Sequence, residues 1–133
     1  MKITVWIDGG CKRNGMPDAQ GYATVRIKGH DDKTWPIELS TAKTNNEAEF
    51  GALLSALDLL SALQDHPGHQ VEIRTDSQDL IGWVMLNWKI KTDHPRLERL
   101  RGVAIDGILE LMKYADVDLV KADRDEIVQM LGH

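Results

Sequence analysis

The period of the hydrophobic pattern changes once in the N-terminal half of the chain, and this change limits the fold most strongly. In residues 3–8, 21–28 and 34–40, apolar or β-branched residues alternate with other side chains at a period of two, which is typical of β-strands. From Asn46 onward, apolar residues recur at spacings of three and four, as on one face of an amphipathic helix that ends near residues 66–68. The two patterns together predict an α/β fold.

The three strand-like runs are expected to pair as an antiparallel meander. A polar turn at residues 29–32 separates the second run from the third. The first run meets Gly9 and Gly10, so we predict that its strand ends in a turn there, with Asp8 at the strand's end. Pro36 has no N–H group to donate to a ladder, which places the third strand at an edge of the sheet.

The C-terminal half continues to mix strands and helices. Residues 71–75 predict a strand, and Asp76 or Ser77 is suited to cap the helix that follows. A long helix is predicted over 96–114, then a strand over 117–121 and a short helix over 125–131. The side chains expected on the inner face of the long helix are Leu97, Leu100, Ala104, Ile108, Leu111 and Met112. The order βββαβααβα predicts a five-stranded mixed sheet flanked by helices.

Length and composition limit the number of domains and the compartment. With 133 residues, of which 42% are hydrophobic, the chain supports one core and is too short for two comfortable domains, so we expect a single domain over 1–133. Cys11 is the only cysteine, which excludes an intramolecular disulfide. Neither a signal-peptide pattern nor an apolar run approaching about 20 residues is present. We therefore expect a soluble, cytoplasmic protein that does not associate with a membrane.

The net charge of −5 argues against a nucleic-acid partner, because proteins that bind nucleic acids are usually basic. The charge is unevenly distributed, however, since residues 89–101 contain five basic side chains and only two acidic ones. This segment is either a basic face or a solvated helix face with mixed charges.

Three acidic residues occupy positions where the predicted elements bring them together. Asp8 ends the first strand, Glu49 opens the first helix and Asp76 follows the fourth strand. If the first and fourth strands are neighbours, the three carboxylates converge on one edge of the sheet. Clustered acids need cations, and oxygen ligands suit Mg²⁺ or Mn²⁺, two of which can support phosphodiester hydrolysis. Singly, each acid also fits a structural role, as a turn residue, a helix-start charge or an N-cap.

The residues around these acids carry a family resemblance. The segments 8–14 (Asp-Gly-Gly-Cys-Lys-Arg-Asn), 44–49 (Thr-Asn-Asn-Glu-Ala-Glu) and 75–78 (Thr-Asp-Ser-Gln) occur in this order and in their expected structural context. Together they closely resemble type 1 ribonuclease H, over nearly the whole chain. The resemblance implies the ribonuclease H-like fold and endonucleolytic cleavage of the RNA strand of RNA–DNA hybrids, largely independent of sequence.

The same resemblance implies roles for individual residues. Asp8, Glu49 and Asp76 would hold two Mg²⁺ ions, with Mn²⁺ as a possible substitute. The residues that would approach the minor groove of the hybrid, where the 2′-hydroxyl marks RNA, are Cys11, Asn14, Asn45, Asn46 and Gln78. Taken without the family, Asn45 and Asn46 are suited to cap a helix, and both roles can coexist.

Residues 83–91 look like the tryptophan-bearing helix end from which longer family members extend a basic, substrate-gripping insertion. That insertion is absent or very short here, because Pro95 and the next helix follow almost at once. Trp88, Lys89 and Lys91 are expected to contact the substrate, with weaker and more salt-sensitive binding than in longer members. For Trp83 and Trp88, packing against the sheet is the alternative.

The C terminus departs from the family pattern. The family places a fourth carboxylate in the first turn of its last helix, and Gln129 falls at that position here. Asp125 is our candidate for the missing ligand, with Glu126 as the other possibility, although Asp125 is equally suited to an N-cap. His133 is either a frayed end or an aid to product release.

Three functions remain open at this stage. The first is an active ribonuclease H, monomeric and without an obligatory protein partner. The second is a hybrid-binding module that cuts weakly because its fourth carboxylate is missing. The third keeps the metal chemistry on another nucleic-acid substrate, although the Asn-Asn and Gly-Gly-Cys residues of the groove count against it.

Overall fold

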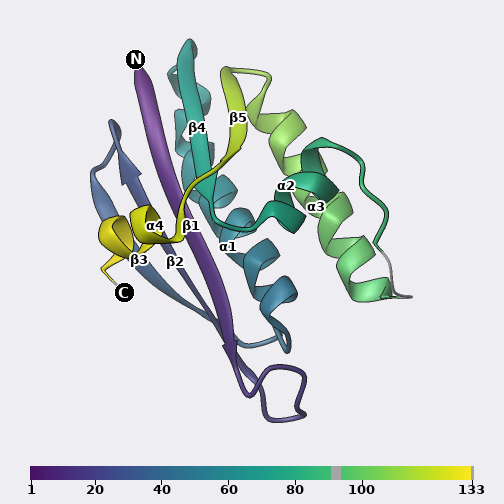
Figure 1. Ribbon diagram of the computed structural model, residues 1–133. Coiled ribbons are helices and arrows are strands. Elements are labelled where there is room, and N and C mark those ends of the chain that lie inside the picture. The colour runs from purple at the N-terminus through teal and green to yellow at the C-terminus, as the bar shows by residue number, and fades with distance from the viewer. Residues whose placement is uncertain (91–93, 133) are drawn as a thin grey trace.

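The computed structural model describes residues 1–90 and 94–132, in which one mixed sheet is covered by helices (Figure 1). The strand order is β3-β2-β1-β4-β5, with β1–β2 and β2–β3 antiparallel and β1–β4 and β4–β5 parallel. The strands are β1 (Lys2–Lys12), β2 (Gln20–Lys28), β3 (Lys33–Leu39), β4 (His69–Thr75) and β5 (Ala115–Lys121). The predicted meander, the edge position of Pro36 and the pairing of the first and fourth strands are all confirmed.

The helices follow the predicted order, with one short addition. They are α1 (Asn45–Leu60), α2 (Gln78–Met85), α3 (Pro95–Leu111) and α4 (Arg124–Leu131), and the 3₁₀ turn η1 (Ser61–Asp65) extends α1. In Figure 1, α1 and α4 lie on opposite faces of the sheet. The alternation of side chains along β1 explains this arrangement, because Val5 and Ile7 join the core with α1 whereas Trp6 packs with Ile127 of α4.

The predicted turn at Gly9 and Gly10 is wrong, because β1 continues through both glycines to Lys12 and remains paired with β2. A Cβ atom at Gly9 would lie 2.1 Å from the carbonyl oxygen of Ala48 in α1. A Cβ atom at Gly10 would lie 2.4 Å from the hydroxyl of Tyr22 in β2. The two glycines therefore permit close approach of neighbouring groups rather than a change of chain direction.

The main core lies between the sheet and the helices α1 and α3. Helix α1 contributes Phe50 and Leu53, and Phe50 stacks on Trp83 of α2 with ring centroids 5.8 Å apart. Helix α3 ends at Leu111, so Met112 is its C-terminal cap residue and is 41% exposed. The predicted inward position of Met112 is therefore wrong. Within the described residues, no helix combines the length and the apolar character that crossing a membrane requires.

Candidate active site

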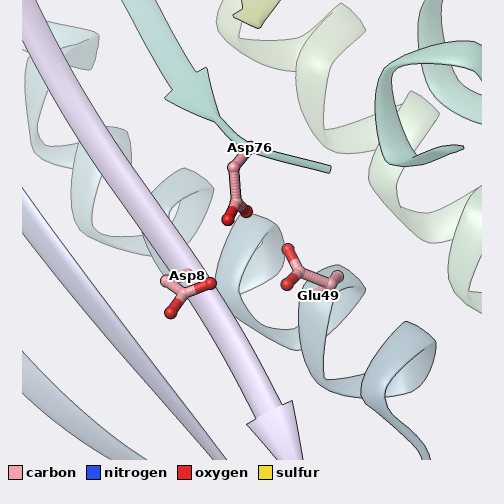
Figure 2. Close-up of side chains that lie close together, drawn as sticks. All are labelled: Asp8, Glu49 and Asp76. Atoms are coloured by element: carbon pink, nitrogen blue, oxygen red, sulfur yellow. The ribbon is translucent and has the colours of Figure 1, made fainter. Parts of the chain in front are cut away.

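Three carboxylates from three different elements meet beside β1 (Figure 2). Asp8 extends from β1, Glu49 from the first turns of α1, and Asp76 from the residue after β4. One oxygen atom from each carboxylate lies within 4.8 Å of the other two. Asp8 is only 5% exposed, and Glu49 and Asp76 are partly buried. The convergence predicted from the sequence is therefore present.

Local structure sets the position of each acid. Gly9 lets α1 approach β1 closely, which brings Glu49 beside Asp8. Ser77 caps α2 by accepting a hydrogen bond from the Leu80 N–H, so the Asp76 side chain is not used as the cap. The buried Thr75 holds this junction, because its hydroxyl accepts from the Ser77 N–H at 3.1 Å.

The electrostatics of the cluster centre on Glu49. Burial, followed by repulsion from Asp8 and Asp76, raises the pKa of Glu49 to about 8, against an opposing hydrogen bond from the Gly9 backbone. Its Oε2 atom is buried and has no hydrogen-bond partner within the described part of the chain. A buried, unpartnered oxygen beside two further carboxylates fits a divalent cation with oxygen ligands.

A basic side chain also reaches this cluster. One guanidinium nitrogen of Arg124, Nη1, lies 3.1 Å from Oδ2 of Asp8 and 3.0 Å from Oδ2 of Asp76. These contacts raise the pKa of Arg124 above its ordinary value. Arg124 is not among the site residues predicted from the sequence. Arg124 is the first residue of α4, where the positive end of the helix dipole disfavours a cation. This unfavourable position is the one feature of the sequence that could have marked Arg124 as a functional residue.

The family model described as RNase H matches residues 1–120 of this chain. The chain belongs to the RNase H family. Ribonuclease HI from Caulobacter vibrioides is 31% identical over 102 residues, which cover 71% of this chain and 63% of that relative. The match thus spans less than two thirds of the relative's length.

Solved structures of RNase H1 proteins share the fold. RNase H1 from Halobacterium salinarum superposes with a TM-score of 0.74 at 24% identity, covering 98% of this chain and 92% of the other. LC11-RNase H1, which was isolated from compost and crystallised in complex with an RNA/DNA hybrid, gives a TM-score of 0.78 at 22% identity, covering 96% and 90%. The resemblance to type 1 ribonuclease H and the predicted fold class are confirmed.

This RNase H chain does not bring the predicted fourth carboxylate into the cluster. Asp125 is exposed, and the group of potential metal ligands among the described residues contains only the three acids named above. Asp123, rather than Asp125, is the N-cap residue of α4. Gln129 is exposed, and His133 lies outside the described residues. Asp125 as a ligand therefore stays a prediction from the sequence alone, and its exposed position outside the described cluster favours the opposite expectation, which Asp125→Asn tests.

Glu126 is engaged elsewhere in the RNase H fold. Its carboxylate accepts hydrogen bonds from Nε of Arg74 at 2.5 Å, from Nη2 of Arg74 at 3.1 Å and from the indole N–H of Trp6 at 2.9 Å. The hydrogen bond from Arg74 is the main reason why the pKa of Glu126 is lowered. Glu126 therefore joins α4 to β1 and β4 instead of facing the acids.

The predicted minor-groove residues are connected around the start of α1. Asn45 accepts a hydrogen bond from the Cys11 N–H at 2.9 Å, and the Asn45 N–H donates to Oδ1 of Asn14 at 2.7 Å. Thr44 is the N-cap, since its hydroxyl accepts from the Glu47 N–H. The interpretation of Asn45 and Asn46 as caps is therefore wrong, because both lie inside the first turn.

A cavity of about 970 Å³ lies between the start of α1 and the segment that follows α2. Five of the residues that are predicted to contact the substrate line this cavity: Asn14, Asn45, Asn46, Trp88 and Lys89. The Trp88 ring covers Gly82 and is 39% exposed, whereas Trp83 stacks on Phe50. Gln78 is exposed at the start of α2 and is not part of the wall, and Lys91 lies outside the described residues.

Proposed function

We propose that this protein is an active ribonuclease H that cuts the RNA strand of RNA–DNA hybrids endonucleolytically, with little dependence on sequence. The observation that carries the proposal is the convergence of Asp8, Glu49 and Asp76 within a chain of the RNase H family. The crystallised complex of LC11-RNase H1 with an RNA/DNA hybrid supports the choice of substrate.

Asp8, Glu49 and Asp76 would hold the divalent ions, Mg²⁺ or its substitute Mn²⁺, and the family pattern implies two of them. When bound, such ions supply Lewis-acid activation of a water and charge compensation at the scissile phosphate. The protein's own contribution is to hold three carboxylates at a fixed spacing on β1, α1 and β4. Because the pKa of Glu49 is raised to about 8, Glu49 carries a proton at neutral pH, and cation binding there must also release that proton.

Polar groups at the start of α1 would select the hybrid. The side-chain Oδ1 of Asn45 accepts from the Cys11 N–H, so the side-chain NH₂ group of Asn45 is the part of its amide that can donate to a substrate. Short amides of this kind suit the 2′-hydroxyls and base edges of a shallow minor groove, with Cys11, Asn14, Asn46 and Gln78 around them. These contacts are to sugars and groove shape, which accounts for cleavage that is independent of sequence.

Trp88 and Lys89 would hold the other strand. Both line the cavity beside α1, where an aromatic face and a basic side chain can contact sugar and phosphate. With Lys91 added from the sequence, the basic surface is small. Hybrid binding is therefore expected to weaken steeply with salt.

Cleavage of a strand-labelled hybrid tests the function. We would incubate the wild type, Asp8→Asn and Asp76→Asn with hybrid, duplex DNA or duplex RNA, and either Mg²⁺ or Mn²⁺. The proposal requires cleavage of the hybrid's RNA strand only, lost in both variants. Asp118→Asn is the matched control, because it makes the same chemical change at an exposed position on β5.

A hybrid-binding module that cuts weakly is the second candidate, because the described acidic cluster contains three carboxylates rather than four. Binding of the hybrid without cleavage in either metal would favour this candidate. The monomeric state, the absence of an obligatory partner and the cytoplasmic location stay predictions. Light scattering during gel filtration tests the first of these.

A further inference from the structure

The acidic cluster already contains a cation from its own chain. Arg124 places the same guanidinium nitrogen within 3.1 Å of Asp8 and 3.0 Å of Asp76. These are two of the three carboxylates that would bind the metal. The hydrogen bonds of Arg124 go to Asp8 and Asp76, and the buried Oε2 atom of Glu49 has no hydrogen-bond partner within the described residues. Arg124 therefore hydrogen-bonds two of the three acids and acts on the buried Glu49 only through its charge, which opposes the rise in the pKa of Glu49 without cancelling it.

The backbone of Arg124 is held in place by the contacts of α4 with the sheet. Helix α4 is attached to the sheet two residues later, where Glu126 bonds Arg74 and Trp6. Ile127 and Leu131 of the same helix pack with Trp6 in the second hydrophobic cluster. In Figure 1 the start of α4 lies beside β1, close to the end of β4. The backbone of Arg124 is thereby held next to the acids.

The side chain of Arg124 can leave without disturbing the core. It is 54% exposed, and the two acids to which it donates hydrogen bonds, Asp8 and Asp76, are members of the acidic cluster. A partly exposed ion pair contributes little stability, about 0–1 kcal/mol. A divalent ion shared by three carboxylates interacts much more strongly than a single guanidinium with two of them. Rotation of the side chain into solvent is thus compatible with the rest of the fold.

We propose that Arg124 is the resident counter-ion of the acidic cluster and competes with divalent ions for Asp8 and Asp76. The inference rests on the proposed function in one respect, since it takes these acids as the metal ligands. Its consequence is that metal binding must displace the guanidinium. The enzyme consequently binds its metal more weakly than the three carboxylates alone would.

Titration of the free protein with Mn²⁺, followed by calorimetry without substrate, tests the competition. Arg124→Gln is expected to bind Mn²⁺ about five-fold more tightly than the wild type, because two partly exposed ion pairs no longer oppose the metal. Arg124→Lys keeps a charge but carries a shorter side chain and a more strongly hydrated ammonium, so its affinity should fall between the two. Lys121→Gln is the control, since Lys121 contacts the Ala122 carbonyl oxygen rather than the acids.

Thermal unfolding supplies a second readout. In chelator, Arg124→Gln should unfold at a lower temperature than the wild type, because the cluster has lost its counter-ion. In saturating Mn²⁺ this difference should vanish, because Arg124 has already been displaced. A difference that persists unchanged in Mn²⁺ would mean that the guanidinium remains on the acids, and would overturn the proposal.

The remaining outcomes of the titration are equally decisive. Unchanged or weaker Mn²⁺ binding by Arg124→Gln would overturn the competition, and so would an equal gain of affinity in Lys121→Gln, which would indicate a general charge effect. In these cases hybrid cleavage by the wild type would leave the proposed function intact. If no protein binds Mn²⁺, both the competition and the metal part of the proposed function fail.

Discussion

The two sides of the acidic cluster carry opposite charges, because one side supplies the carboxylates and the other supplies a guanidinium. On the side formed by β1, α1 and β4, three acids are forced together at a fixed spacing. On the side formed by α4, the acids point elsewhere, because Glu126 is bonded to Arg74 and Asp125 is exposed, while Arg124 faces the cluster. The three carboxylates of the first side need a cation nearby, and the guanidinium of Arg124 on the second side is such a cation. Arg124 therefore offsets part of the negative charge of the three acids.

The largest expected effect comes from removing a carboxylate on the first side. Asp8→Asn or Asp76→Asn should lower the rate of hybrid cleavage by about a thousand-fold, since a metal ligand worth several kcal/mol is lost. Initial rates at saturating Mg²⁺ measure this. A loss of ten-fold or less in both variants would mean that neither acid carries the chemistry.

The glycine that positions this side offers the next test. Gly9→Ala places a methyl group 2.1 Å from the Ala48 carbonyl oxygen, so α1 must move away from β1 and take Glu49 with it. We expect a loss of about 3 kcal/mol in the free energy of unfolding together with a large loss of cleavage. Urea denaturation and the cleavage assay measure the two effects.

Gly102→Ala is the matched control for that substitution. Gly102 lies in α3, and a Cβ atom there meets nothing within 4 Å. The change should raise stability by about 0.5–1 kcal/mol through helix propensity. Equal destabilisation by both substitutions would contradict the special role assigned to Gly9.

The pH dependence of stability in the metal-free protein tests the burial of Glu49 on the first side. The pKa of Glu49 is raised from 4.5 to about 8 in the folded state, so the folded protein binds more protons than the unfolded chain between these values. This contribution to stability is present at low pH and is lost as pH rises through about 8. In Glu49→Gln the loss should disappear. Urea unfolding in chelator from pH 5 to 8, for both proteins, would refute this if the two slopes agree.

The smallest expected effect concerns the anchor on the α4 side. Arg74→Ala removes hydrogen bonds to Glu126 and Glu72, but these side chains are partly exposed, so we expect a loss of about 1 kcal/mol in the free energy of unfolding. A double-mutant cycle with Glu126→Gln isolates the pair. A coupling energy of zero would mean that the Arg74–Glu126 pair does not help to hold α4, and that its other contacts, such as the Trp6–Glu126 hydrogen bond and the packing of Ile127, are sufficient.

Sequence patterns predicted the first side well because its determinants are local. Period-two and period-3.6 runs define β1, α1 and β4, and the acids lie within β1, within α1 and directly after β4. The error at Gly9 and Gly10 has a physical origin. Glycine serves both turns and close backbone approach, and only the position of Ala48 and Tyr22 across the interface distinguishes these uses.

The second side could not be predicted in the same way because its determinants are distant in sequence. Glu126 is hydrogen-bonded to Arg74, which is 52 residues away in the sequence, and to Trp6, which is 120 residues away. These contacts set the rotation of α4 and hence decide whether Arg124 or Asp125 faces the acids. The candidate Asp125 was chosen from its place at the strand-to-helix junction, and such a place does not fix the direction of a side chain.

One measurement tests the contrast between the two sides most directly: cleavage of the same hybrid at saturating Mg²⁺ by Asp76→Asn and by Asp125→Asn. We predict that the first variant is inactive and that the second retains cleavage close to the wild type, because Asp125 lies outside the described cluster. Loss of cleavage in Asp125→Asn, with the fold intact and Mn²⁺ binding weakened, would contradict this account and make Asp125 the fourth ligand.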